Sequence, residues 1–305
     1  MHLGCATDER RVPIRDLLLF LEEAMRLEDM EKVRELKQLA MSQTRALKDP
    51  ETYRKFLDCV SLAYPRYRSL QNLALIFSQC PHATDVGALG NCWIPRNRTK
   101  KEYEPGIEII VPCHKQNQDG RKIKAGEIAV SVYDISQTEG DSVPEDRRRV
   151  MKISDLYVLF VQFLQDNGHD VIEAELSEGH SLIDAKTVWV EIRDDELVKL
   201  TNLIKEYSHV IHRHLHILHM AACTRVLEFQ AVSTAYSVCR KLGLECPENP
   251  FSSMSGLVQR LREDIFVKAL ELSLVIAFQI HREFAHYAGL EHNDLAEVAE
   301  ERQVA

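Results

Sequence analysis

The chain has 305 residues, of which 45% are hydrophobic and 28% charged, and its formal net charge is −9. This balance is that of a globular protein, and the negative charge argues against a protein that coats nucleic acid over its whole surface. The longest apolar stretches, such as residues 270–280, contain polar residues and fall short of the roughly 20 apolar residues that a membrane helix needs, so we expect no membrane partner and a cytoplasmic location.

Helical periodicity dominates the first part of the chain. Apolar residues recur at helical spacing from Pro13 to Leu47 among many charged residues, which predicts one or two amphipathic helices. We interpret residues 1–48 as a helical extension that packs on the main body or on a partner protein. A further helix is predicted from Asp49 to about Ala63, because Asp49 suits the N-cap and Pro50 the first turn.

The next segment, residues 49–140, mixes helix and strand and is predicted to form one domain. A helix is expected at 69–79, and strands are expected at 107–112 and 129–135. Residues 141–150 are mostly polar, contain Pro144 and include three arginines at 147–149, which is typical of a linker.

The remainder is predicted to be a mostly helical domain with a small sheet, residues 151–292, followed by an acidic tail, residues 293–305. Strands are expected at 171–176 and 187–192, and helices at 153–167, 195–227, 231–242 and 257–287. The whole pattern predicts an α+β protein.

Two motifs, in this order, resemble one known family. The first is SLQNLALIFSQCPHAT at Ser69–Thr84, which continues to Trp93 and closes with VYDISQT at Val132–Thr138. It resembles the amino-terminal single-stranded-DNA-binding domain of ArdC-type antirestriction proteins, in which S-x-x-N-x-x-L-I-x-x-Q-x-P-x-A-T precedes a tryptophan and a strand that ends in D-[VI]-S-Q-T. The resemblance implies single-stranded DNA as a partner of this segment.

The second motif begins at the strand 188–192 and runs through HRHLH at His212–His216 to AYSVCRKLGL at Ala235–Leu244. It is similar to the zincin-like metallopeptidase domain that follows in the same family, where HELAH precedes E-x-E-A-E-x-x-A-Y-x-V-C-x-x-x-G-L. Here Arg213 stands at the position of the glutamate. The acidic motif reads EFQAV, so only Glu228 remains of its acids.

The replacement by Arg213 bears directly on catalysis. In a zinc peptidase the two histidines bind the metal, and the glutamate between them takes a proton from the metal-bound water. Arginine cannot take this role, because its pKa above about 12 keeps it protonated and its charge opposes a dication. We therefore expect no peptide hydrolysis by the family mechanism, and no residue is assigned a catalytic role.

Zinc binding is a separate question. On one straight helix, four histidines fall within an arc of about 80°. The candidate zinc ligands are His212 and His216, with help from His209, His219 or Glu228. The alternative is a set of solvated or hydrogen-bonded histidines left after the loss of an ancestral site. A second pair, His281 and His286, diverges by about 140° on an unbroken helix and predicts no metal site.

A local basic segment lies at residues 66–124, with ten Lys or Arg against five acids, a balance of +5. Aromatic residues, among them Trp93 and Tyr103, are interleaved with these charges. Cations along a phosphate backbone and rings that stack on bases are features of single-strand binders, whereas the alternative is a solvated face with core aromatics. The candidate nucleic-acid-binding residues are Arg66, Arg68, Asn72, Trp93, Arg96, Arg98, Lys100, Lys101, Arg121, Lys122 and Lys124.

These observations leave three hypotheses of different classes. The main one is a DNA-associated, single-strand-binding protein of a bacterium or mobile element, with an inactive zinc-peptidase-like domain in a binding or regulatory role. The enzyme alternative is a zinc peptidase with rearranged ligands, which uses His212, His216 and Glu228. The third is an interaction module, in which the extension and the former active-site cleft bind another protein.

Overall fold

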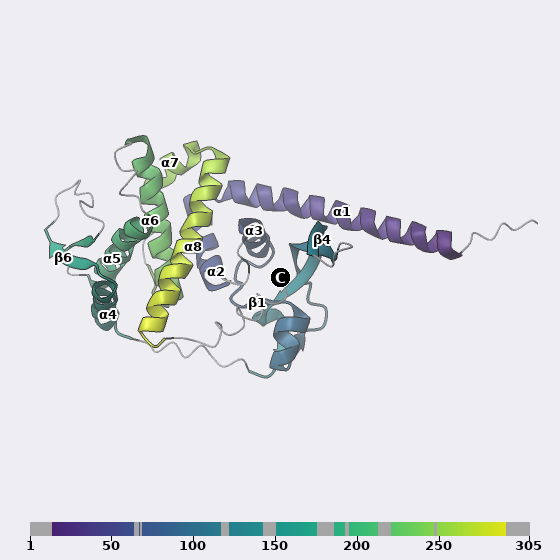
Figure 1. Ribbon diagram of the computed structural model, residues 1–305, viewed down its shortest axis with the longest axis horizontal. Coiled ribbons are helices and arrows are strands. Elements are labelled where there is room, and N and C mark those ends of the chain that lie inside the picture. The colour runs from purple at the N-terminus through teal and green to yellow at the C-terminus, as the bar shows by residue number, and fades with distance from the viewer. Residues whose placement is uncertain are drawn as a thin grey trace, which may run out of the picture.

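The computed structural model describes residues 14–63, 67, 69–116, 122–142, 151–175, 186–192, 195–212, 221–246 and 249–290. For residues 14–27, 63, 115–116, 122–125 and 221–224 it describes the backbone alone. Helices and small sheets alternate along the chain, which confirms the α+β prediction (Figure 1). In the described part, none of the helices is long and apolar enough to cross a membrane.

The amino-terminal part combines three helices with small antiparallel sheets. The helices are α1 (Ile14–Ala46), α2 (Pro50–Ala63) and α3 (Leu70–Gln79), which confirms the predicted helices in this region. The strands are β1 (Val86–Gly87), β2 (Arg98–Lys100), β3 (Ile107–Gln116), β4 (Lys122–Asp134) and β5 (Thr138–Gly140). They form a three-stranded sheet in the order β1-β4-β3 and a separate pair, β2-β5. Three short turns, η1 (Leu89–Trp93), η2 (Ile94–Arg96) and η3 (Ile135–Gln137), join them.

Helix α1 is a single helix that docks on this part through its carboxy-terminal half. Val33, Leu36 and Ala40 are buried against Leu75 of α3 and Ile110 of β3. The amino-terminal half of α1 projects past the sheet (Figure 1). The extension of residues 1–48 is therefore attached to the main body over its described second half.

The carboxy-terminal part is mainly helical. Its helices are α4 (Ile153–Asp166), α5 (Glu196–Ile211), α6 (Ala221–Lys241), α7 (Ser255–Arg260) and α8 (Glu263–Tyr287), with a short turn, η5 (Ser252–Met254), before α7. Strands β6 (Asp170–Ala174) and β7 (Thr187–Glu191) correspond to the two predicted strands, and they pair in parallel. Aromatic and aliphatic side chains of α4, α5, α6 and α8 enclose β7 in one hydrophobic cluster.

Two predicted helix boundaries in this part are wrong. The helix expected at 195–227 ends at Ile211, and the next helix runs without a break from Ala221 to Lys241, across the boundary expected before Ala231. Phe229 and Gln230, where the break was placed, are buried, and the sequence there contains neither glycine nor proline to stop a helix. Burial against neighbouring helices therefore keeps α6 continuous.

The largest hydrophobic cluster joins the two parts of the chain. It contains Tyr53 and Phe56 of α2 together with Phe229 of α6 and Phe266 of α8. The Tyr53 hydroxyl also donates a hydrogen bond of 2.9 Å to Ser233 Oγ in α6. The linker predicted at residues 141–150 thus does not separate two independent cores. The domain limits at residues 49–140 and 151–292 stay a prediction.

Two amide side chains of α3 bind the backbone of β3. Asn72 Nδ2 donates to Ile110 O at 2.8 Å, and Asn72 Oδ1 accepts from Ile110 N at 3.0 Å. Gln79, two turns later, makes the same pair of bonds with the backbone of Glu108, both at 2.9 Å. Asn72 is buried whereas Gln79 is exposed. These amides satisfy strand groups that have no neighbouring strand on that side.

The difference in burial gives a matched pair of variants. Asn72→Ala should lower the free energy of unfolding by about 3 kcal/mol, because it leaves a buried N–H and C=O of Ile110 without partners. Gln79→Ala, which removes the same two bonds at an exposed position, should cost about 1 kcal/mol or less, since water can replace the amide. Urea unfolding of both variants measures the difference. Equal losses would contradict the dependence on burial.

Candidate functional site

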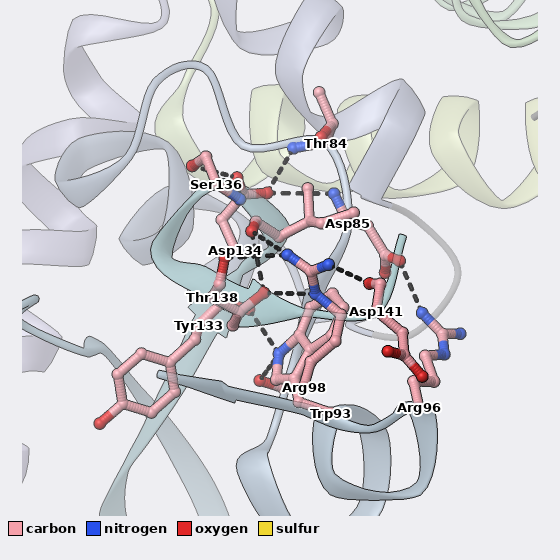
Figure 2. Close-up of polar contacts among 12 residues, drawn as sticks. Thr84, Asp85, Trp93, Arg96, Arg98, Tyr133, Asp134, Ser136, Thr138 and Asp141 are labelled. Atoms are coloured by element: carbon pink, nitrogen blue, oxygen red, sulfur yellow. Dashed lines mark hydrogen bonds and ion pairs between the residues drawn. The ribbon is translucent and has the colours of Figure 1, made fainter. Parts of the chain in front are cut away.

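The DISQT segment builds a turn around one buried carboxylate. Asp134 Oδ1 accepts hydrogen bonds from the backbone of Thr84 at 2.7 Å and of Asp85 at 3.1 Å. Its Oδ2 accepts from Ser136 N at 2.9 Å and Ser136 Oγ at 2.6 Å, and the Gln137 side chain accepts from Asp134 N (Figure 2). The carboxylate therefore joins the end of β4 to the chain that leads into β1.

Two arginines of the basic segment are held by the same region. Arg98 Nε donates to Thr138 Oγ1 at 2.9 Å, and its Nη2 donates to Thr138 O at 2.8 Å. Arg98 also donates to the carbonyl of Asp141, and Arg96 pairs with Asp85 at 2.8 Å (Figure 2). These guanidinium groups close the β2-β5 pair and the η2 turn. Because both arginines have hydrogen-bond or ion-pair partners within the chain, they contribute to the structure of this region.

Two candidate nucleic-acid contacts are corrected by their burial. Trp93 is 0% exposed, and its indole Nε1 donates to Gly87 O at 2.9 Å and to Tyr133 O at 3.0 Å. A ring enclosed in this way cannot stack on a base. The buried amide of Asn72 is likewise engaged with the backbone of Ile110. Both residues belong to the core, because a side chain that is polar or aromatic in sequence can still be buried when its polar atoms find partners.

The remaining candidates fall into two places. Lys100 and Lys101 are exposed beside the β2-β5 pair, where Lys101 Nζ donates to Ser136 O at 2.7 Å. Lys122 and Lys124 lie on β4 at the end of the hairpin, where the backbone register sets them opposite β3. The candidates Arg66, Arg68 and Arg121 lie outside the described residues.

In the described part of the histidine site, the ammonium of Lys205 lies beside His209 and Glu228. His209 Nε2, near the end of α5, lies 3.1 Å from Glu228 Oε2 on α6. The other oxygen of Glu228 pairs with Lys205 Nζ at 3.1 Å, and the same ammonium lies 3.1 Å from Glu206 Oε1. Lys205 and His209 are four residues apart and therefore share a face of α5. Both side chains contact Glu228, the single acid in the EFQAV segment.

The charges at this site shift two pKa values in opposite directions. Burial by itself would raise the pKa of Glu228, but the hydrogen bond with His209 and the charge of Lys205 outweigh it and lower the pKa to about 2. Burial likewise opposes the charge of Lys205, yet the Glu206 and Glu228 carboxylates raise the pKa of Lys205 above its usual value. Both groups are therefore ionised at neutral pH.

His212 points to different surroundings. Its Nε2 lies 3.0 Å from Thr234 Oγ1 on α6, and that hydroxyl donates to Ser273 O of α8 at 3.3 Å. His212 follows the last residue of α5, so the assumption of one straight helix through all four histidines is wrong. Arg213, His216 and His219 lie outside the described residues, and their assigned roles stay predictions.

The described residues do not fit a zinc site. Among them, no group of three or more His, Cys, Asp or Glu side chains is placed to hold a metal ion. His209 and His212 are directed at different partners, and Glu228 already neutralises the ammonium of Lys205. A dication at Glu228 would have to compete with this ammonium, which lies at hydrogen-bonding distance.

The second histidine pair lies on a regular helix. His281 and His286 are both within α8, which runs unbroken from Glu263 to Tyr287. The helix predicted for this segment is therefore confirmed. The divergence of the two imidazoles was argued for such an unbroken helix.

Comparisons with known proteins find a partial similarity in backbone structure and no similarity in sequence families. No protein-family model matches the sequence, and no curated protein sequence matches it either. The metal-free crystal structure of the antirestriction ArdC protein from plasmid R388 shares 11% identity, with 72% of this chain and 86% of that chain covered at a TM-score of 0.46. The Mn(II)-bound structure of that protein shares 14% identity, with 72% and 85% covered at the same TM-score. A likeness at this level carries no argument about what the chain binds.

Sequence reasoning missed Lys205 and Thr234. The signal for Lys205 was its spacing of four residues from His209, which places both on one helix face beside any acid that approaches that face. Thr234 gave no comparable signal, because its contact with His212 depends on how α5 packs against α6. The helix pairing thus decides which polar residues meet the histidines.

The depressed pKa of Glu228 predicts an acid-dependent loss of stability. Glu228 is ionised in the folded chain down to about pH 2, whereas its ordinary value is 4.5, so its contribution is complete above about pH 4.5 and is lost as the pH falls toward 2. Glu228→Gln should lower the free energy of unfolding at pH 7 by about 1 kcal/mol, since a side chain that is 40% exposed is partly screened by solvent.

Urea unfolding of the wild type and the variant at pH 7 and at pH 3 measures this effect. The difference between the two proteins should shrink at the lower pH. Glu271→Gln, at an exposed position of α8, serves as the control and should show no such trend. A difference for Glu228→Gln that stays constant with pH would contradict the assignment.

Proposed function

We propose that the chain binds single-stranded nucleic acid through the basic end of the β3-β4 hairpin, and that its histidine-bearing helical part does not hydrolyse peptides. The hairpin register carries the first half of the proposal. It sets Lys122 opposite Gln116, Ile123 opposite Lys115 and Lys124 opposite His114. Lys122 and Lys124 are two residues apart on β4 and therefore share one face of the hairpin, whereas Lys115, opposite Ile123, lies on the other face. The outer end of the hairpin thus carries lysines on both faces, in a chain whose net charge is −9.

Lysines two residues apart on a strand share one face, and the repulsion between like charges on that face is relieved when an anion binds. A phosphate backbone supplies regularly spaced negative charges, and lysines that neutralise them release condensed counterions. The resemblance of the motifs at Ser69–Thr84 and Val132–Thr138 to a single-stranded-DNA-binding domain favours a single strand as the ligand.

Replacing Lys115, Lys122 and Lys124 together by glutamate should weaken binding to a labelled oligothymidine strongly. If each lysine makes one phosphate contact, the dependence of log affinity on log salt should fall by about 2, which is three contacts at roughly 0.7 each. Fluorescence anisotropy at several salt concentrations measures both quantities. The melting temperature should be nearly unchanged, because the flanking described positions of the hairpin, His114 and Gly126, are exposed.

A control of equal charge keeps this test specific. Lys152, Arg260 and Lys268 are exposed in the carboxy-terminal part, and their replacement by glutamate makes the same change in net charge. This control should retain most of the binding. Equal losses in both triple variants, or no binding by the wild type at low salt, would overturn the proposal, and the interaction-module hypothesis would take its place.

The second half of the proposal is supported by the contacts of Glu228. In a hydrolytic site this acid would be needed for the metal or for proton transfer, but here it is tied to Lys205 and His209. Arg213 at the position of the general base is a second cation near the same motif. The ammonium of Lys205 disfavours a dication at Glu228. An arginine at the position of the general base cannot take a proton from a metal-bound water. This arrangement argues against the peptidase with rearranged ligands.

Purified protein should therefore show no cleavage of denatured proteins, with or without added zinc or manganese. The measurement is product formation on an unfolded substrate with a chelator arm. His212→Ala should leave the background rate unchanged. Chelator-sensitive cleavage that His212→Ala abolishes would show that the site is catalytic and contradict this half of the proposal.

A further inference from the structure

One aromatic side chain is displayed to solvent by a strained turn. Tyr103 lies between β2 and β3 and is 90% exposed. Its backbone has φ +64°, in the left-handed region, and the carbonyl of Lys101 accepts from Glu104 N at 3.3 Å. Tyr103 is therefore the third residue of a tight turn, a position that glycine or asparagine fits with less strain.

The fold gains little from a tyrosine at this position. The left-handed conformation costs free energy for a residue with a Cβ, and the ring recovers none of it by burial because it is almost fully exposed. Glycine would satisfy the turn without this strain. The side chain therefore has no evident role inside the fold, which points to a contact outside it.

The turn is held firmly on both sides of the ring. Lys101 N donates to Gln137 O at 2.9 Å, and Gln137 Nε2 donates to Pro105 O at 2.8 Å. Gln137 in turn belongs to the Asp134 turn, since its Oε1 accepts from Asp134 N. A ring on an anchored turn loses little conformational freedom when a ligand stacks on it.

We infer that Tyr103 is a stacking surface for an unpaired base, the role that the sequence pattern had suggested for Trp93. This inference rests on the proposed function. The residues that flank Tyr103 along the chain are charged, Lys101, Glu102 and Glu104, whereas a protein-docking surface needs a wider apolar patch. Aromatic side chains stack on bases of any sequence, but only where the bases are not already stacked in a duplex.

The charges near the Tyr103 ring indicate that the ring and the hairpin lysines contribute to nucleic-acid binding in different ways. The turn holds one cation, Lys101, against two acids, Glu102 and Glu104, so it concentrates no positive charge that would attract phosphates. Tyr103 should therefore act by stacking, with little dependence on salt, while the hairpin lysines determine the salt dependence. The two contributions can be separated by experiment.

The test compares Tyr103→Ala, Tyr103→Phe and Tyr103→Gly for binding to a labelled oligothymidine. Alanine and glycine should lower the affinity about tenfold, the order of one lost base stack, with the salt slope unchanged. Phenylalanine should retain the wild-type affinity. The melting temperature should not fall in any variant, and glycine should raise it, because glycine relieves the strained φ.

A strand of abasic sites of the same length provides the matched ligand control, because it keeps the phosphates and removes the bases. Wild type and Tyr103→Ala should bind it equally. Oligothymidine binding that is unaffected by Tyr103→Ala but lost in the hairpin variant would overturn this inference and leave the proposed function standing. Failure of the wild type to bind any strand at low salt would overturn the proposed function itself, and a tenfold loss for the abasic strand would show that Tyr103 does not act through bases.

Discussion

Buried backbone groups must find hydrogen-bond partners, and in the amino-terminal part of this protein side chains supply many of them. The Asp134 carboxylate accepts from two backbone N–H groups before β1 and from one after β4. Asn72 binds both backbone groups of Ile110 on the side of β3 that faces α3. These contacts fix the turns and α3 relative to the three-stranded sheet, in addition to the apolar packing between α3 and the sheet. The Tyr103 turn depends on the same network through Gln137.

This constraint explains what the family-like motifs contain. Ser69 caps α3 by accepting from Asn72 N, and Asn72 and Gln79 bind β3. The DISQT residues form the carboxylate turn. The residues that carry the resemblance therefore build a scaffold, and they are largely withdrawn from solvent or engaged. In the proposed function, contacts with a ligand fall to residues between the motifs, such as the lysines of the hairpin and Tyr103, where the fold places little demand on side-chain identity.

The histidine site illustrates the same division between scaffold and chemistry. The ammonium of Lys205 on α5 lies 3.1 Å from the Glu228 carboxylate on α6 and partly neutralises it. A fixed internal cation of this kind stabilises the packing of α5 on α6 at neutral pH and competes with any other cation for the Glu228 carboxylate. The Glu228 carboxylate thus contributes to structure by joining α6 to Lys205 and His209 of α5.

Local sequence determined the α+β class and most helices and strands, because caps, prolines and apolar periodicity are local signals: Asp49-Pro50 before α2 and Ser69 before α3 are examples. It also located the basic segment and the histidines. Burial was decided only by the tertiary structure, since whether Trp93 faces solvent or core depends on the strands that enclose it, and whether α6 continues past Phe229 depends on the helices around it. The partners of His209 and His212 were likewise fixed by the packing of α5 on α6, a long-range contact that no local pattern encodes.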